Sequence, residues 1–388
     1  MNGVNGRRNN PYIIGIPIRE RSQFYGRESL FCFIEDQLLG DVKVILLHGQ
    51  RRIGKSSVLQ QIPNFIKSNE FIFVQFDLEH QRRSSLSSII HDLATAIIEQ
   101  VTKQLKLDDK KLQRLTKAEL EQDINLFTKK FLPHLYKTIK YKKIVLLLDE
   151  FDVINNSDKN NNIVEQENFI LFLEKLINEQ PNLFVIPVSG THLHDLHNLP
   201  TLFRCAPNQE IDVLDDISAE NIIVNPAKDS LIYQPEAIKK ILQLSARHPC
   251  FIQVICFTLF EKARNENKSN IEAADVKNIL NQAIKKADSF LQSFWDTLTI
   301  EEKIIITTVA EAEKRAIEQQ KKVPEEPLYL LDINNTKQRE QLRQAWEKLR
   351  VKGYLYQEGR KIKVELIRHW LLQYHSFTHY ERKYKILK

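Results

Sequence analysis

The clearest chemical signal in the sequence is a glycine-rich stretch that reads Gly-Gln-Arg-Arg-Ile-Gly-Lys-Ser, with the spacing GxxxxGKS. Its glycines let the backbone curl so that successive N–H groups point at phosphate oxygens. Lys55 is expected to reach the β- and γ-phosphates, and the Ser56 hydroxyl to hold Mg²⁺. We therefore predict a site for ATP or ADP with Mg²⁺, formed by Gly49, Gln50, Arg51, Arg52, Ile53, Gly54, Lys55, Ser56 and Ser57.

Two acids follow an apolar stretch about 95 residues further along. Lys143–Leu148 reads as a buried strand, and Asp149 and Glu150 come directly after it. Because ligands of α/β proteins bind at the carboxyl ends of parallel strands, these acids should lie near the glycine-rich loop. Asp149 is predicted to orient Mg²⁺, and Glu150 to polarise the attacking water, so that Lys55 and Glu150 are candidate catalytic residues.

A third strand, Leu183–Val188, ends in small polar residues. Ser189 or Thr191 is a candidate for sensing the γ-phosphate. The histidines at positions 192, 194 and 197 follow in the pattern HxHxxH, with Asp195 among them. A metal site is one interpretation of this pattern, but we favour a polar loop near the nucleotide, since the chain offers no recognised ligand framework.

The elements around these residues alternate in type. Strand Val42–Leu47 precedes the loop, and the following helix, Ser57–Ile66, contains Pro63, which should bend or shorten it. Next come strand Phe71–Leu78 and helices at Leu86–Gln104 and Ala118–Lys140. This order predicts an α/β fold of the P-loop type, with a parallel sheet covered by helices.

The strand pattern ends after Leu214, and the next segments read as helices at Ser218–Val224, Pro235–Ala246, Phe251–Arg264 and Ala273–Ala287. They suggest a helical lid that can swing when the γ-phosphate is lost. Helices at Ile300–Lys314 and Lys337–Val351 follow, and then two short strands, Tyr354–Gln357 and Lys361–Glu365, around the turn Glu358–Arg360. Helix, helix and hairpin predict a winged helix-turn-helix.

The composition narrows the possible classes of protein. The chain has 388 residues, enough for two or three domains, and 42% of them are hydrophobic, which excludes wholesale disorder. No stretch approaches the ~18 apolar residues of a membrane-spanning helix. The N-terminal residues lack the apolar stretch of an export signal, and the four cysteines form no CxxC pair. We expect reduced thiols, a cytoplasmic location and no membrane partner.

Positive charge gathers at the C-terminal end. Thr336–Lys388 carries 14 Lys and Arg against 5 Asp and Glu, a net of +9, whereas the whole chain has a net charge of +6. A winged helix that binds duplex DNA would place the helix from Lys337 in the major groove and the hairpin against phosphates. The contact residues would be Arg339, Arg343, Arg360, Lys361 and Lys363. The alternative is that this domain only packs internally.

The chain resembles STAND-type members of the AAA+ P-loop ATPases, close to prokaryotic ATPases related to archaeal origin-recognition initiators. The matching stretches are NPYIIGIPIRERSQFYGRESL at the start, GQRRIGKSS, LLLDEFD, SARHPCFIQVIC and the C-terminal hundred residues. The resemblance implies domains at 1–28 (beside the adenine), 29–214 (the ATPase core), 215–287 (the lid) and 288–388 (the winged helix). The chain departs from the family's pattern at Arg247, where a glycine is common.

The resemblance also implies roles for single residues. Tyr25 and Arg27 would flank the adenine, and His248 and Pro249 would pack the lid against the nucleotide. Arg204 falls where related ATPases place an arginine that reads phosphate or reaches a neighbouring subunit, although by itself it reads as a surface arginine.

Three functions remain open at this level. The first is a slowly hydrolysing molecular switch that forms a homo-oligomer in its ATP state and acts with a separate sensor or effector protein. The second is a DNA-binding AAA+ ATPase, similar to initiators or transposition regulators, that assembles on duplex DNA. The third is a nucleotide-binding scaffold that does not hydrolyse ATP.

Overall fold

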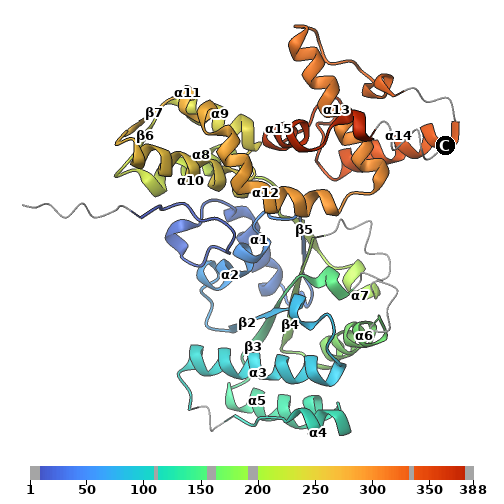
Figure 1. The fold of residues 1–388 in the computed structure, drawn as a ribbon. Helices are drawn as coiled ribbons and strands as arrows, with labels where there is room; N and C mark the ends of the chain where they lie inside the picture. The colour runs from blue at the N-terminus through green and yellow to red at the C-terminus, as the bar shows by residue number, and fades with distance from the viewer. Residues whose placement is uncertain (1–8, 109–111, 155–162, 191–199, 332–335, 381–388) are drawn as a thin grey trace, which may run out of the picture. The chain divides into compact units, whose positions relative to one another are not determined.

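The computed structural model describes residues 9–108, 112–154, 163–190, 200–331 and 336–380, which fold into two compact units. The α/β unit is Pro17–Asp212, and the helical unit combines Met1–Ile16 with Val213–Lys388 (Figure 1). The chain therefore passes between the units twice. The domain limits expected at residues 28, 214 and 287 remain predictions.

A parallel five-stranded sheet forms the centre of the α/β unit, in the order β2-β3-β4-β1-β5 (Figure 1). Most of its residues in β1, β3 and β4 are buried, as in a sheet that is covered on both faces. The predicted α/β class is thus confirmed. The strands are β1 (Leu46–His48), β2 (Phe71–Asp77), β3 (Lys143–Asp149), β4 (Leu183–Ser189) and β5 (Asn208–Glu210).

Helices cover the sheet of the α/β unit. One large core joins alternate strand residues to α3, α5 and α6, while α2 contacts β2 and β3. The helices are α1 (Glu28–Leu39), α2 (Lys55–Phe65), α3 (Leu86–Leu105), α4 (Lys117–Gln122), α5 (Leu132–Thr138), α6 (Ile163–Glu179) and α7 (Thr201–Arg204).

Two of these helices differ from the expectation. Pro63 lies inside α2 without ending it. Proline has no N–H to donate to the Leu59 carbonyl, and the Gln75 side chain of β2 donates to that carbonyl instead, at 3.1 Å. The single helix expected over 118–140 is instead broken. Asp123 accepts hydrogen bonds from the backbone and side chain of Asn125, both at 2.9 Å, and a π-helical turn and α5 follow.

The helical unit begins with an N-terminal segment that is bound to α10. The Asn10 amide donates to the Phe257 carbonyl at 3.0 Å, and Ile13 N donates to Gln253 Oε1 at 2.9 Å. The elements of this unit are α8 (Asp216–Val224), β6 (Ile232–Tyr233), α9 (Pro235–Ser245), α10 (Pro249–Asn265), β7 (Asn270–Ile271), α11 (Ala273–Asn278), α12 (Leu280–Asp296), α13 (Ile300–Glu318), α14 (Thr336–Val351) and α15 (Glu365–Tyr374).

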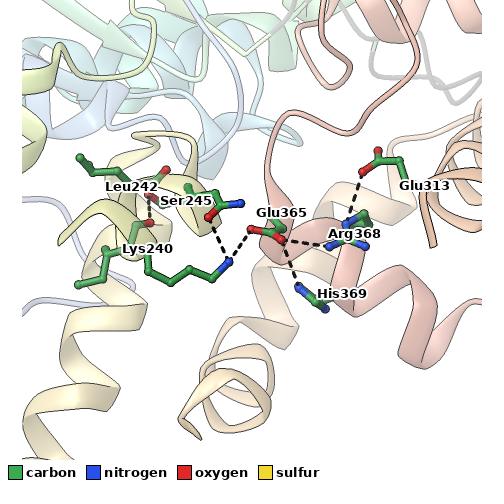
Figure 2. Close-up of polar contacts among 9 residues, drawn as sticks. Lys240, Leu242, Ser245, Glu313, Glu365, Arg368 and His369 are labelled. Carbon is green, nitrogen blue, oxygen red and sulfur yellow. Dashed lines mark hydrogen bonds and ion pairs between the residues drawn. The ribbon is translucent and has the colours of Figure 1, made fainter. Parts of the chain in front are cut away.

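A partly buried charge network joins three helices of this unit (Figure 2). Glu365 begins α15 and lies 3.3 Å from the Lys240 ammonium of α9 and 3.1 Å from Arg368. The hydrogen bond from His369, together with the two cations, lowers the pKa of Glu365 to about 2. Arg368 also lies 3.5 Å from Glu313 of α13, and burial raises the pKa of Glu313 to about 7.

The C-terminal hairpin is shorter than expected. Its two predicted strands reduce to one antiparallel bridge between Leu355 and Ile362, and α15 begins at Glu365, where the second strand was expected to end. The Trp346 indole of α14 donates to the Gly359 carbonyl at 2.9 Å and fixes the turn. Gly359 has φ +70°, and a Cβ there would lie 2.6 Å from the indole nitrogen, so this position requires glycine. The winged-helix assignment stays a prediction.

No helix in the part of the chain that the structure describes combines the length and the apolar character needed to cross a membrane.

Candidate nucleotide-binding site

The glycine-rich loop leaves the sheet at β1, which lies between β4 and β5. Gly49 N donates to the Ser189 carbonyl at 3.2 Å, and Ile211 N donates to the His48 carbonyl at 2.7 Å. A Cβ on Gly49 would lie 2.5 Å from the Ile211 carbonyl oxygen. Only glycine therefore fits between the two strands at the start of the loop.

The loop ends at Gly54, which precedes α2. Gly54 has φ +102° and ψ 24°, a left-handed conformation that glycine adopts without strain. Its carbonyl accepts the first hydrogen bond of the helix, from Val58 N at 2.9 Å. The N-terminus of α2 carries the partial positive charge and the free N–H groups that bind phosphate oxygens.

Lys55 is the first residue of α2, and its side chain is buried under the loop. The residue is 6% exposed, and its ammonium donates to the carbonyls of Gly49 at 3.3 Å and Gln50 at 3.2 Å. Burial lowers the pKa of Lys55, while nearby carboxylates, Glu150 first among them, oppose this effect. The charge of Lys55 is thus held among acids at the end of the sheet.

Ser56 and Asp149, the two predicted metal ligands, lie together. Asp149 ends β3 and accepts hydrogen bonds from the Ser56 side chain and, at 3.0 Å, from Glu150 N. Burial raises the pKa of Asp149, so its charged form is poorly solvated without a cation. A hydroxyl and a carboxylate are the hard oxygen ligands that Mg²⁺ prefers, so this pair fits the expected ion.

Glu150 follows Asp149 in a left-handed backbone conformation, with φ +52°. Such a conformation costs a residue other than glycine about 1–2 kcal/mol, and strain of this kind is concentrated at functional sites. Burial raises the pKa of Glu150, and the charge of Lys55 partly offsets the effect. A raised pKa suits a carboxylate that takes a proton from water near neutral pH.

Asp152 also belongs to the site, although it was not among the predicted site residues. It is 7% exposed, and its carboxylate accepts a hydrogen bond from Gly190 N at 3.0 Å. A third acid two positions after Glu150 was visible in the sequence, but the sequence did not reveal that Asp152 is buried.

Ser189 ends β4, between the strand of the loop and the strand of the acids. It is fully buried and pairs in register with His48. The second sensor candidate, Thr191, lies outside the described residues, as do the three histidines of the HxHxxH pattern.

Arg27 contacts the loop backbone directly. Its guanidinium donates to the Ile53 carbonyl at 2.9 Å, and its own backbone is left-handed, with φ +70°. Ser57 accepts a hydrogen bond from Ile18 N at 3.0 Å, so the segment before Arg27 is also bound to α2. Tyr25 is half-buried in the same unit, and its pKa is raised by burial. The structure does not place an adenine, so the roles of Tyr25 and Arg27 beside a base stay predictions.

Solved structures of nucleotide-binding proteins share this architecture. A Walker-type ATPase of Pyrococcus abyssi matches with a TM-score of 0.59 and 16% identity, over 92% of this chain and 98% of that one. The ORC2 protein of Aeropyrum pernix, solved with ADPNP and ADP, matches with a TM-score of 0.54 and 12% identity, over 93% and 96%. The Drosophila ORC bound to DNA matches with a TM-score of 0.50 and 14% identity, over 96% and 94%.

The chain has the fold of a Walker-type, ORC-like ATPase. The predicted resemblance to AAA+ P-loop ATPases of the origin-recognition type is confirmed at the level of the fold. Neither a protein-family model nor a curated protein sequence matched the chain.

The other predicted residues of the α/β unit differ in how they relate to Lys55. The Gln50 carbonyl accepts a hydrogen bond from the Lys55 ammonium, whereas the side chains of Arg51 and Arg52 are exposed. Arg204 is an exposed residue of α7, and its guanidinium donates to Thr201 Oγ1 at 3.3 Å. No contact within the described residues brings Arg204 to the loop.

The predicted lid residues are in the helical unit. His248 precedes α10, Pro249 begins it, and the buried His248 ring lies 4.8 Å from that of Phe251. Arg247, the departure from the family pattern, pairs with Asp216 at 3.0 Å. The predicted contact of His248 and Pro249 with the nucleotide remains a prediction, because it would join the two units.

The residues predicted to contact DNA lie on α14 and the hairpin, and two of them form ion pairs with glutamates. Arg339 lies 3.6 Å from Glu326, and Arg360 lies 3.1 Å from Glu325. The other three, Arg343, Lys361 and Lys363, are exposed or half-buried.

No group of three or more His, Cys, Asp and Glu side chains suited to a metal occurs in the described segments. Mg²⁺ at Ser56 and Asp149 would therefore depend on phosphate oxygens and water for its other ligands.

Proposed function

We propose that the protein binds ATP with Mg²⁺ and hydrolyses it slowly, and that the nucleotide state controls its domain arrangement and its partners. The observation that carries this proposal is the convergence of Lys55, Asp149 and Glu150 at the end of β1 and β3. Burial disfavours the charged form of each of these side chains, yet all three lie within electrostatic reach of one another.

The residues divide the work of hydrolysis. The loop amides and the N-terminus of α2 bind the phosphates, and Lys55 exchanges its two carbonyl partners for β- and γ-phosphate oxygens. Mg²⁺ held by Ser56 and Asp149 supplies charge neutralisation when bound. A water oxygen bonds to the γ-phosphorus as the bond to the bridging oxygen breaks, and Glu150 accepts the proton of that water. The products are ADP and phosphate.

The switch requires a difference in affinity between two states. Moving a population from 1:99 to 99:1 takes roughly 5.5 kcal/mol. Contacts of the γ-phosphate with Lys55 and Ser189 would supply part of that energy, and His248 with Pro249 would convey it to the lid. Arg204 would act on phosphate within the subunit or reach the next subunit of a homo-oligomer. A separate sensor or effector protein would read the ATP state.

Changing Glu150→Gln tests the catalytic assignment. We expect hydrolysis to fall by about 100-fold or more, since general-base catalysis contributes 10²–10⁴-fold, while ATP affinity is retained. Glu99→Gln, at an exposed position of α3, is the matched control and should leave both properties unchanged. Unchanged hydrolysis in Glu150→Gln would reject the role of this residue. A wild-type chain that binds ATP without turnover would favour the non-hydrolysing scaffold.

A DNA-binding ATPase is the second candidate. The net charge of +9 over Thr336–Lys388, the exposed Arg343 and Lys361, and the fold shared with an ORC solved on DNA favour it. Anisotropy of labelled duplex DNA against salt, with and without ATP, would test this candidate. Binding through several phosphates gives a steep salt dependence. Absence of binding near physiological salt would remove the DNA candidate and leave the switch.

A further inference from the structure

The inference concerns the buried carboxylate of Asp152, to which the function proposed above assigns no task. We propose that Asp152 is a positioning residue: through the Gly190 amide it fixes the end of β4, with Ser189, beside Lys55, and so sets the rate at which bound ATP is hydrolysed. This role rests on the proposed ATP hydrolysis.

The first argument is the cost of burying this carboxylate. Asp152 is 7% exposed, and its carboxylate interacts electrostatically with the Lys55 ammonium. Its hydrogen-bond donor is the Gly190 backbone amide, at 3.0 Å. Placing a carboxylate away from water is costly unless its partners compensate for the lost solvation. The chain thus places a poorly solvated charge on the backbone of the segment that leaves β4.

The second argument is how closely three groups approach one another. A Cβ built on Gly190 would lie 3.3 Å from Asp152 Oδ2 and 3.5 Å from the Lys55 ammonium nitrogen. The Gly190 backbone therefore lies close to both charged groups. A side chain at this position would crowd the Asp152 carboxylate and contact the Lys55 ammonium.

The third argument is the place of this contact in the sheet. β4 lies between β1, which leads to the loop, and β3, which leads to Glu150. Ser189 is the last residue of β4, and the next amide is the one that Asp152 holds. A hydrogen bond at this point fixes the Ser189 backbone relative to both Lys55 and Glu150. Because the transferred phosphoryl group must lie among these residues, a small displacement here affects the transition state more than it affects ATP binding.

Two substitutions separate positioning from charge. Asp152→Ala removes the acceptor, and we expect kcat to fall about tenfold, the equivalent of ~1.4 kcal/mol, with the Kd for ATP changed by less than about threefold. Asp152→Asn keeps an oxygen acceptor without the charge, and it should restore kcat to within about threefold of wild type. Asp92→Ala, at an exposed carboxylate of α3, is the control and should match wild type.

The readouts are kcat from steady-state phosphate release and Kd from titration with a fluorescent ATP analogue. Gly190→Ala keeps the amide but crowds the Asp152 carboxylate, and it should also lower kcat. This variant tests the same contact should Asp152→Ala not fold. Wild-type kcat in Asp152→Ala, or equal losses in the Ala and Asn variants, would overturn the positioning role. A wild-type chain that neither binds nor hydrolyses ATP would refute the proposed function itself, and this role with it.

Discussion

The tight approach of Gly49 to β5 predicts that Gly49→Ala destabilises the α/β unit. The added Cβ would lie 2.5 Å from the Ile211 carbonyl oxygen, whereas ordinary contact begins at 3.4 Å, so the strands must open by 0.9 Å. Two hydrogen bonds flank this point, Leu46 N to the Pro207 carbonyl at 2.9 Å and Ile211 N to the His48 carbonyl at 2.7 Å. Overpacking of this kind costs about 1–3 kcal/mol.

For a unit of this size, a loss of about 2 kcal/mol lowers the melting temperature by about 4–8 °C. Thermal unfolding followed by far-UV circular dichroism measures the midpoint, and hydrogen exchange of residues 207–212 reports the opening of β5. Gly40→Ala is the matched control, because Gly40 has φ −74° and its new Cβ would lie 3.2 Å from the nearest oxygen, which requires a much smaller shift than the 2.5 Å contact at Gly49. A Gly49→Ala chain that melts with wild type and the control, with unchanged exchange over 207–212, would refute the reasoning.

Three further predictions follow from contacts outside the acids of the site. Arg27→Ala removes the guanidinium from the Ile53 carbonyl and should weaken ATP binding about tenfold, since a charged hydrogen bond contributes about 1.5 kcal/mol or more; an unchanged Kd by titration would contradict this role. The pKa of Glu313 is raised to about 7, so its contribution to stability is full below its ordinary range near 4.5 and is lost as pH rises through 7. Between pH 5 and pH 8 the free energy of unfolding of wild type, measured by denaturant titration, should therefore fall by about 3 kcal/mol more than that of Glu313→Gln. Parallel pH profiles of the two proteins would argue against this role of Glu313. Changing Glu325→Gln and Glu326→Gln together frees two arginines, so duplex DNA should bind more tightly with a steeper salt dependence; equal slopes would show that the acids do not compete with phosphate.

The sequence predicted those parts of the fold that depend on local pattern. The apolar stretches of β3 and β4 and the glycine loop between β1 and α2 lie where they were expected, because strand burial and glycine spacing are visible in neighbouring residues. A single helix does not form over 118–140 because the Asp123 side chain accepts a hydrogen bond from the Asn125 backbone amide. The spacing of apolar residues in the sequence does not reveal such competition.

The site prediction was incomplete where a contact joins residues that are distant in sequence. Asp152 and the contact of Arg27 with Ile53 depend on residues that are distant in sequence, and no spacing rule brings them together. Pro63 was expected to bend or shorten its helix; α2 continues to Phe65, and the Gln75 side chain of β2 supplies the hydrogen bond that Pro63 cannot donate to Leu59. The strands of the hairpin after α14 were predicted to be too long. The hydrogen bond between Trp346 and Gly359 fixes the turn, but the two strands pair through a single bridge.

The affinity for ATP of wild type and Lys55→Ala, measured with Mg²⁺ by calorimetric titration, tests the central claim most directly. Lys67→Ala, at an exposed lysine shortly after α2, is the control. The loop geometry predicts that Lys55→Ala loses about 100-fold or more in affinity, the equivalent of ~2.7 kcal/mol, while Lys67→Ala binds like wild type. Micromolar affinity retained in Lys55→Ala would contradict the assignment of this loop as the phosphate site.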